Sequence, residues 1–216
     1  MAITLSTGSV FAIASTYGSS VTMSAITNAS EAVATLAAGH SCVVGDYLEV
    51  TSGWGRLDKK IVRVKNVATN DITFEGINTS NTTTYPTGSG TGSIRRITAW
   101  TNLSQVQSSS VSGGDLQYAD VTAIDDVVAK QIPTIRSAVS LSLTVFDDPS
   151  LAWYTVVANA DDTRTPYALR ITSANGAKTV ANAYWSLQRT PNIQQNAAMT
   201  TSIGLSYAAE PTRYAT

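Results

Sequence analysis

The chain has 216 residues, of which 43% are hydrophobic and only 13% are charged, and its formal net charge is −1. A hydrophobic fraction of this size allows a real core, whereas the lack of a basic excess argues against a nucleic-acid-binding protein. The charged fraction is about half of the usual ~25%. Because a surface poor in charge is weakly protected against association, we expect either a polar secreted β protein or, in preference, a subunit covered by copies of itself.

The single cysteine, Cys42, permits no disulfide bond within the chain. Residues 1–8 have neither a basic region nor a long apolar run, so they do not resemble a secretory signal. Apolar runs elsewhere are only a few residues long, which is too short to span a membrane. We therefore expect a protein that is made and folded in a cytosol and is not inserted into a membrane.

Short alternating segments fill the N-terminal half and predict β-strands separated by turns. Residues 32–37 also fit a short helix, but their Val and Thr content favours a strand. From Gly45 to Trp100 the pattern indicates a small β-barrel or roll, with a mobile Ser-, Thr- and Gly-rich loop at 79–92. The expected strands lie at residues 9–14 and 20–27, on either side of Tyr17-Gly18, and at 32–37, 47–51, 60–67, 72–77 and 93–100.

Residues 104–132 differ from the β segments before them. Their first part, from Gln105 to Asp115, is rich in Ser and Gly and predicts a long extended loop. The apolar residues that follow have near-helical spacing, which predicts a short helix or an irregular segment before Pro133; they are Val121, Ile124, Val127 and Val128. A loop of this length inside a compact domain usually serves binding or assembly.

Residues 134–146 alternate between apolar and small or polar side chains, which predicts one long strand with a single buried face. The expected buried positions are Ile135, Val139, Leu141, Leu143 and Val145.

A helix is expected to follow this strand, because Asp148 can cap a helix and Pro149 suits its first position. The helix would run from Ser150 to about Ala160. The remaining expected strands are 166–172 and 178–188, joined by a hairpin turn at Asn175-Gly176, and a closing strand at 198–207. Together these segments predict an antiparallel sheet with a single helix packed on it.

No known catalytic, cofactor-binding or metal-binding signature is present in the sequence. His40 is the only histidine, so a zinc site or a Ser-His-Asp triad would lack its other groups. Adjacent acidic residues point to opposite faces of a strand and make poor acid–base couples. Gly88, Gly90 and Gly92 do not lead from a strand into a helix, as a nucleotide-binding loop requires. We interpret the basic cluster as the solvated face of a strand; it contains Arg56, Lys59, Lys60, Arg63 and Lys65.

The C-terminal half carries short motifs in a fixed order and spacing. They are Gln117-Tyr118, Ile132-Pro133-Thr134, Phe146-Asp147-Asp148-Pro149, Trp153, Ala168-Leu169-Arg170-Ile171, Asn175-Gly176, Tyr184-Trp185-Ser186-Leu187, Pro191, Ile203-Gly204-Leu205-Ser206 and the terminal Glu210–Thr216. Through these motifs, residues 100–216 resemble the tail tube proteins of long-tailed bacteriophages. Residues 39–54 are similar to a small β module that some of these phage proteins carry in their N-terminal half.

The resemblance implies a mainly β fold, in which an antiparallel β-barrel or sandwich is flanked by one α-helix and carries a small inserted β-barrel-like module. The expected tube core comprises residues 1–29 and 98–216, with a long assembly loop at about 104–132. The module would comprise residues 30–97 and face outward.

The resemblance also implies a structural role in the virion tail and no enzymatic activity, cofactor or metal. Subunits of this kind join their sheets into hexameric rings, and the rings stack into a tube that houses the tape measure protein and conducts DNA. The implied partners are further copies of the chain, the tape measure protein, the tail terminator, and baseplate or initiator proteins. Genomic DNA would pass through the lumen without sequence-specific binding, and the protein would be made in the host cytoplasm.

Two sets of residues are expected to serve this role. Contacts between subunits or rings are expected in the long loop, at Gln107, Ser110, Gly113, Gly114, Asp115, Gln117 and Tyr118. A conduit for DNA should be neutral to acidic so that phosphates do not adhere to it. The candidate lumen carboxylates are Asp125, Asp126, Asp147, Asp161 and Asp162.

Two other classes of protein remain open from the sequence. One is another virion component of similar β fold, such as a tail terminator, a decoration protein or a baseplate protein. The other is a carbohydrate-binding module, whose stacking residues would be Trp54, Trp100, Trp153 and Trp185. Most of these tryptophans lie in predicted strands or in the predicted helix, which favours a place in the core.

Overall fold

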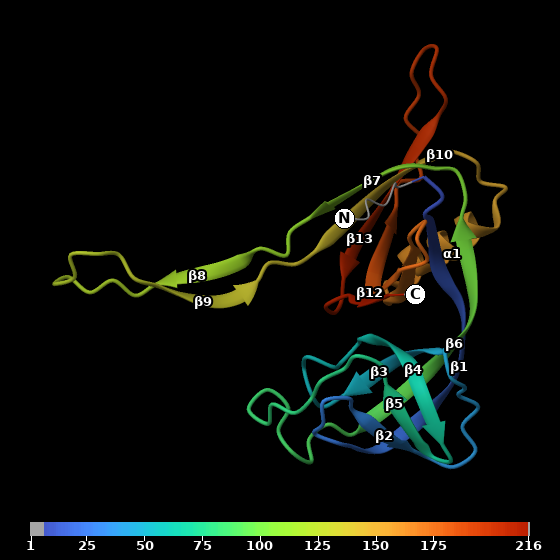
Figure 1. The fold of residues 1–216 in the computed structure, drawn as a ribbon. Coiled ribbons are helices and arrows are strands. Elements are labelled where there is room, and N and C mark those ends of the chain that lie inside the picture. Colours follow the sequence, from blue (N-terminus) through green and yellow to red (C-terminus); the bar gives the residue numbers. More distant parts are fainter. Residues whose placement is uncertain (1–6, 216) are drawn as a thin grey trace.

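The computed structural model describes residues 7–215, which form fourteen strands and one helix arranged as two lobes and a projecting arm (Figure 1). This architecture confirms the predicted mainly β fold with a single helix. The elements are β1 (Val10–Ile26), β2 (Val33–Leu36), β3 (Tyr47–Ser52), β4 (Ile61–Ala68), β5 (Asp71–Phe74), β6 (Gly92–Leu103), β7 (Val106–Ser112), β8 (Leu116–Asp120), β9 (Gln131–Arg136), β10 (Ser140–Phe146), α1 (Ala152–Thr163), β11 (Tyr167–Thr172), β12 (Lys178–Leu187), β13 (Thr200–Tyr207) and β14 (Thr212–Tyr214).

Most strands belong to one continuous antiparallel sheet, in the order β2-β5-β4-β3-β6-β1-β11-β12-β13-β10-β7. The long strands β1 and β6 run through both lobes and pair along their length (Figure 1). The sequence predicted two strands around Tyr17-Gly18, and this prediction is wrong. β1 is a single strand because register shifts between Ala14 and Ser20 accommodate the irregularity within the ladder, as β-bulges do.

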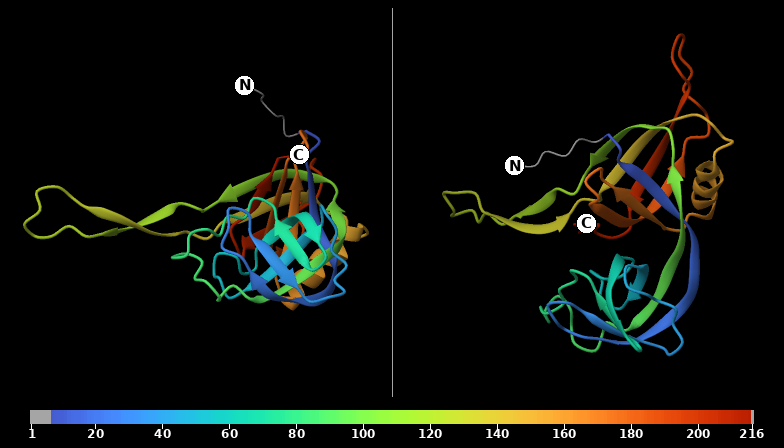
Figure 2. Two further views of the ribbon diagram at one scale, coloured as in Figure 1. Left: turned by 60° about the horizontal axis from the view of Figure 1, so that its bottom comes forward. Right: turned by 45° about the vertical axis from the view of Figure 1, so that its right-hand side comes forward.

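The small lobe consists of β2 to β5 with the adjoining parts of β1 and β6 (Figure 2). Its core includes Trp54, Phe74 and Ile94, each almost fully buried. The loop at 79–92 is held to this lobe, since the indole of Trp54 donates to the carbonyl of Pro86 over 2.8 Å. The strand favoured at residues 32–37 is confirmed as β2, and the other predicted strands of this region are present with small shifts of their ends.

The large lobe packs α1 against the sheet around a second core, which includes Leu143, Trp153 and Val157. α1 begins at Ala152, two residues later than predicted, and Asp148 does not cap it. The Asp148 carboxylate instead accepts hydrogen bonds from the backbone and hydroxyl groups of Ser150, at 3.0 and 2.6 Å, which forms a turn before the helix. Leu151 is the residue at the N-cap position.

The hairpin between β11 and β12 turns where the sequence predicts. Gly176 has φ = 85°, a conformation that glycine adopts without steric cost. The amide of Ser173 donates to the carbonyl of Ala177 over 2.8 Å, and this bond closes the turn. The strands at 166–172, 178–188 and 198–207 are thereby confirmed as β11, β12 and β13.

The long strand predicted at 134–146 is wrong, because the chain divides there into β9 and β10. Leu141, Leu143 and Val145 of β10 are buried as predicted, whereas Ile135 of β9 is 74% exposed. The extended loop predicted at the start of segment 104–132 is also wrong, because the chain there forms β7 and β8, and β8 pairs with β9 in a separate two-stranded sheet. Of the two alternatives for the residues before Pro133, the irregular segment is confirmed, since residues 121–130 form neither helix nor strand.

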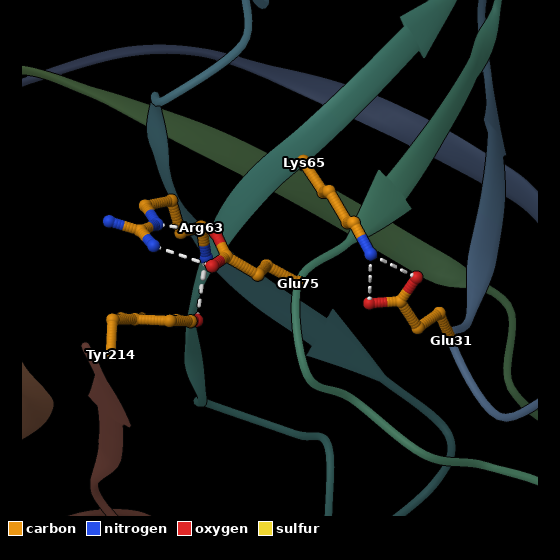
Figure 3. A network of polar contacts seen from close by, with 5 residues as sticks. All are labelled: Glu31, Arg63, Lys65, Glu75 and Tyr214. Atoms are coloured by element: carbon orange, nitrogen blue, oxygen red, sulfur yellow. Dashed lines mark hydrogen bonds and ion pairs between the residues drawn. The ribbon is translucent and has the colours of Figure 1, made fainter. Parts of the chain in front are cut away.

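The two lobes meet at a third buried cluster in which the C-terminal strand β14 takes part. The Tyr214 hydroxyl accepts a 2.8 Å hydrogen bond from the backbone amide of Arg63 in β4 (Figure 3). The Arg63 guanidinium lies 4.6 Å from the Tyr214 ring centre and also pairs with Glu75. Asn182 of β12 makes a similar connection by donating to the buried carboxylate of Glu49 over 2.8 Å. Side chains of the large lobe thus form hydrogen bonds with polar groups of the small lobe.

We expect Tyr214→Phe to lower the free energy of unfolding by about 1 kcal/mol, because it removes one hydrogen bond and leaves the Arg63 amide unpaired. The ring that packs against Arg63 would remain. Urea unfolding measures the effect, and Tyr118→Phe on an exposed strand is the matched control, expected within about 0.5 kcal/mol of the parent. Equal stability of the two variants would show that the Tyr214 hydrogen bond does not hold the lobes together.

Candidate assembly surface

The most unusual element is a β-hairpin that projects away from both lobes (Figures 1 and 2). We call residues 115–136 the arm; it contains β8 and β9, which pair only with each other in the described structure. An isolated two-stranded hairpin is marginally stable in water. Within the described residues, the arm therefore depends mainly on the hydrogen bonds between its own two strands.

Two consecutive glycines direct the chain from β7 into the arm. Gly113 and Gly114 have φ angles of 80° and 86°, which side chains other than glycine rarely adopt. A Cβ atom on Gly113 would lie 2.0 Å from the carbonyl oxygen of Ala138, so a side chain cannot fit there. The sequence thus fixes a sharp change of direction at this point.

Hydrogen bonds hold the two strands of the arm together near its base. The Asp115 amide donates to the Ser137 hydroxyl over 3.1 Å, and the Ser137 amide donates to the Asp115 carbonyl over 2.9 Å. The Arg136 guanidinium donates to the Gly114 carbonyl over 3.1 Å. These bonds cross the hairpin where it leaves the body and so define its direction.

The far end of the arm, residues 120–130, is its tip. The Asp120 carboxylate accepts from the amide and hydroxyl of Thr122, and the hydrogen bond with that hydroxyl lowers the Asp120 pKa. Asp126 pairs with Lys130, which lowers the pKa of its carboxyl, and it also accepts from the Ala123 amide over 2.9 Å. The tip therefore has internal hydrogen bonds and stays negatively charged at neutral pH.

The tip exposes apolar side chains for which the sequence pattern predicted a short helix or an irregular segment. Ile124 and Val127 are fully exposed, and Val121 and Val128 are largely exposed. Contiguous exposed apolar groups on a soluble chain mark an interaction site. These residues have helix-like spacing in the sequence, but in the structure they lie in the turns of an irregular tip.

The predicted contact residues fall on two adjoining segments. Gln107 and Ser110 lie on β7, while Gly113, Gly114 and Asp115 form the base of the arm, and Gln117 and Tyr118 lie on β8. Among residues 7–215, β7 is the last strand in the order of the large sheet and pairs with β10 on one side only. Its residues Gln107–Ser112 are exposed. A free sheet edge can pair with a strand of another chain.

The five predicted lumen carboxylates do not form one surface. Asp125 and Asp126 lie at the arm tip, whereas Asp161 and Asp162 lie at the end of α1, where Arg189 approaches them at 3.9 and 2.5 Å. Asp147 follows β10, and its amide donates to the carbonyl of Met199 over 3.0 Å. Because Arg189 and Met199 flank the β12–β13 loop, Asp147, Asp161 and Asp162 lie around the base of that loop.

His40 and Cys42, the other residues considered for catalysis or metal binding, lie in sites that hold the fold together. The His40 ring lies 2.8 Å from the carbonyl oxygen of Thr69, and Cys42 is buried. Within residues 7–215 there is no group of three or more potential metal ligands. Among the same residues, no helix has the length and apolar character needed to cross a bilayer.

The aromatic and basic candidates are also accounted for. Trp54, Trp153 and Trp185 are at most 3% exposed, so they offer no face to a sugar ring. Trp100 packs against Tyr47 and lies 4.5 Å from the Arg170 guanidinium. Two residues of the basic cluster pair with carboxylates across strands of the small lobe, Arg63 with Glu75 and Lys65 with Glu31 (Figure 3).

Comparison with models of known protein families decides the identity of the chain. Residues 52–216 match the family described as phage tail tube protein. The chain belongs to the phage tail tube protein family. No curated protein matched the chain. The family confirms the resemblance given by the sequence motifs and makes this chain a structural, non-enzymatic component of the virion tail that associates with itself into a tube.

Proposed function

We propose that this tail tube protein assembles into stacked rings through two elements, the free edge of β7 and the arm. The observation that carries the proposal is the arm itself, a hydrogen-bonded hairpin with an apolar tip and no strand pairing to either lobe in the described structure. Such a hairpin has a physical reason to exist only if another subunit covers its apolar groups.

Ring closure follows from the exposed edge of β7. Pairing of this edge with a strand of the next subunit would satisfy its unpaired amide and carbonyl groups and extend the sheet. Repetition of one heterologous contact closes into a ring, and a second heterologous contact stacks rings into a filament. A hexameric ring is the closed form we propose, with the arm as the second contact.

The proposed tube houses the tape measure protein before infection and conducts DNA afterwards. A lumen that lets a polyanion pass should offer little positive charge. Of the candidate carboxylates, Asp147, Asp161 and Asp162 lie together around the base of the β12–β13 loop, and Arg189 balances one of the three charges. We assign the lumen role to this group first, and assign Asp125 and Asp126 to subunit contacts because they lie on the arm tip.

The two lobes would have different positions in the tube. Residues 1–29 and 98–216 would form the tube wall, and residues 30–97 an outward-facing module, except that the end of β1 belongs to the module, because Met23 is part of its core. The long strands β1 and β6 connect the two parts. The further partners proposed are the tail terminator and the baseplate or initiator proteins, which would meet the tube at its two ends. Synthesis in the host cytoplasm completes the proposal.

Sedimentation velocity tests the assembly proposal. A tube subunit grows without limit as its concentration rises, so species heavier than any single ring should appear above a critical concentration. A terminator-like subunit would stop at one ring, and a discrete ring at every concentration would therefore reject stacking by this chain.

A further inference from the structure

A cavity of about 640 Å³ lies where the arm joins the body, and we call it the root pocket. Three segments distant in the sequence line it: the base of the arm, the connection from β13 to β14, and the turn after β3 in the small lobe. Its walls include the apolar side chains of Leu116, Ile135 and Tyr207 and the charged side chains of Arg56, Arg136 and Glu210.

The charge of the root pocket is positive. It contains two arginines and one glutamate, and Glu210 lies close enough to Lys60 for their charges to interact. Arg136 is held in place by its bond to the Gly114 carbonyl. Arg56 is exposed and has no ion pair within residues 7–215, so its charge is available to an incoming group.

The arm tip has the complementary properties. It carries three carboxylates against one lysine, and Lys130 already pairs with Asp126. Asp125 lies beside the fully exposed Ile124 and has no ion pair within the described residues. An acidic, apolar tip thus matches a basic pocket with apolar walls.

The tip cannot enter the pocket of its own chain. The arm leaves the body at the root pocket and extends away from it in every view (Figures 1 and 2). The paired strands β8 and β9 lie between the pocket and the tip, so the tip would reach its own pocket only if this ladder broke. The matching occupant is therefore the tip of another copy.

We propose that the arm tip of each subunit docks in the root pocket of a neighbouring subunit, with Asp125 facing Arg56 and with Ile124 and Val127 against the apolar walls. This inference rests on the proposed self-assembly and identifies the root pocket as the binding site of the arm tip. The contact is heterologous, because every copy offers one tip and one pocket, and it therefore propagates from copy to copy. It also gives the small lobe a part in assembly, through Arg56.

Charge exchange tests the proposal with the full-length chain. Arg56→Glu places two acidic groups together, and Asp125→Lys places two basic groups together, so each variant alone should raise the critical concentration for tube formation about tenfold. A one-to-one mixture of the two variants should recover assembly, since each tip then finds an oppositely charged pocket on the other variant. The double variant should recover it as well.

Two further variants separate the contact from other effects. Arg164→Glu makes the same change of charge at the C-terminal cap of α1 and should assemble like the parent, because α1 lies on the side of the body away from the arm (Figure 1). Ile124→Ser combined with Val127→Ser should weaken assembly about tenfold or more without altering the folded monomer, because both residues are fully exposed.

The outcomes distinguish this inference from the proposed function. If the parent forms tubes and both single charge variants do so equally well, the root pocket is not the socket, although the chain remains a tube subunit. Weakened single variants that neither the mixture nor the double variant rescues would also overturn the pairing of Asp125 with Arg56. If the parent fails to form tubes under all conditions, the proposed function fails first.

Discussion

Removal of the arm is expected to leave a folded monomer that cannot form tubes. Ser112 of β7 pairs with Ser140 of β10, so an Asn-Gly turn in place of residues 113–139 would join the two strands as a tight hairpin. The arm makes no strand pairing with either lobe in the described structure. Its loss should therefore change the thermal midpoint by only a few degrees while it abolishes a contact on which assembly depends.

Circular dichroism during heating and electron microscopy at high concentration measure the two halves of this expectation. A folded variant that still forms tubes of normal length would contradict the role of the arm. A variant that loses its cooperative unfolding would instead show that the arm supports the fold of the body.

We expect Trp153→Ala, which truncates the largest buried side chain of α1, to destabilise the fold more than any other single substitution that we propose. Trp153 is 1% exposed and belongs to the core that joins α1 to the sheet. Trp153→Ala should lower the free energy of unfolding by about 3–5 kcal/mol, since it removes buried apolar surface and leaves a cavity. Denaturant unfolding followed by circular dichroism measures the loss.

Two comparisons show whether packing causes the effect. Trp153→Phe should cost less than the alanine change, because phenylalanine replaces most of the buried ring. The buried indole nitrogen of Trp153, which phenylalanine lacks, has no hydrogen-bond partner among the described residues. Thr155→Ala, on the exposed side of the same helix, should stay within about 0.5 kcal/mol of the parent. A loss below about 1 kcal/mol for Trp153→Ala would mean that α1 does not depend on this side chain.

Local sequence patterns correctly predicted most of the strands and turns that pack within the two lobes. The alternation of Leu141, Leu143 and Val145 predicted a strand with one buried face, and β10 has that face. Asn175-Gly176 predicted a hairpin turn because the turn needs a residue with positive φ, and Gly176 supplies it. Periodicity is informative at these positions because the partner that buries the residues belongs to the same chain.

The same reasoning failed where the chain leaves its own body. Ile135 and Val139 have the same parity as Leu141, so a period-two pattern continues across the break between β9 and β10, although Ile135 is exposed. Val121 to Val128 show helical spacing on a tip that is not helical. Apolar periodicity indicates that one face of an element will be buried. It does not indicate whether the residues that bury this face belong to the same subunit or to another one.

The position of the candidate site could be predicted only in part. The Ser- and Gly-rich composition of residues 105–115 predicted an extended loop and so missed β7, although Gly113 and Gly114 of this segment do redirect the chain into the arm. The root pocket could not be anticipated, since Arg56, Arg136 and Glu210 come from segments that only the tertiary fold brings together. The spacing of residues along the sequence does not show which distant segments the tertiary fold brings together.

Negative-stain electron microscopy of the purified protein at high concentration, alone and with an added tail initiator complex, shows whether this chain forms tubes. We expect hollow tubes of stacked rings, with a sixfold pattern in end-on views. Particles that remain monomers or single rings even with the initiator complex would contradict the claim that this chain builds the tube.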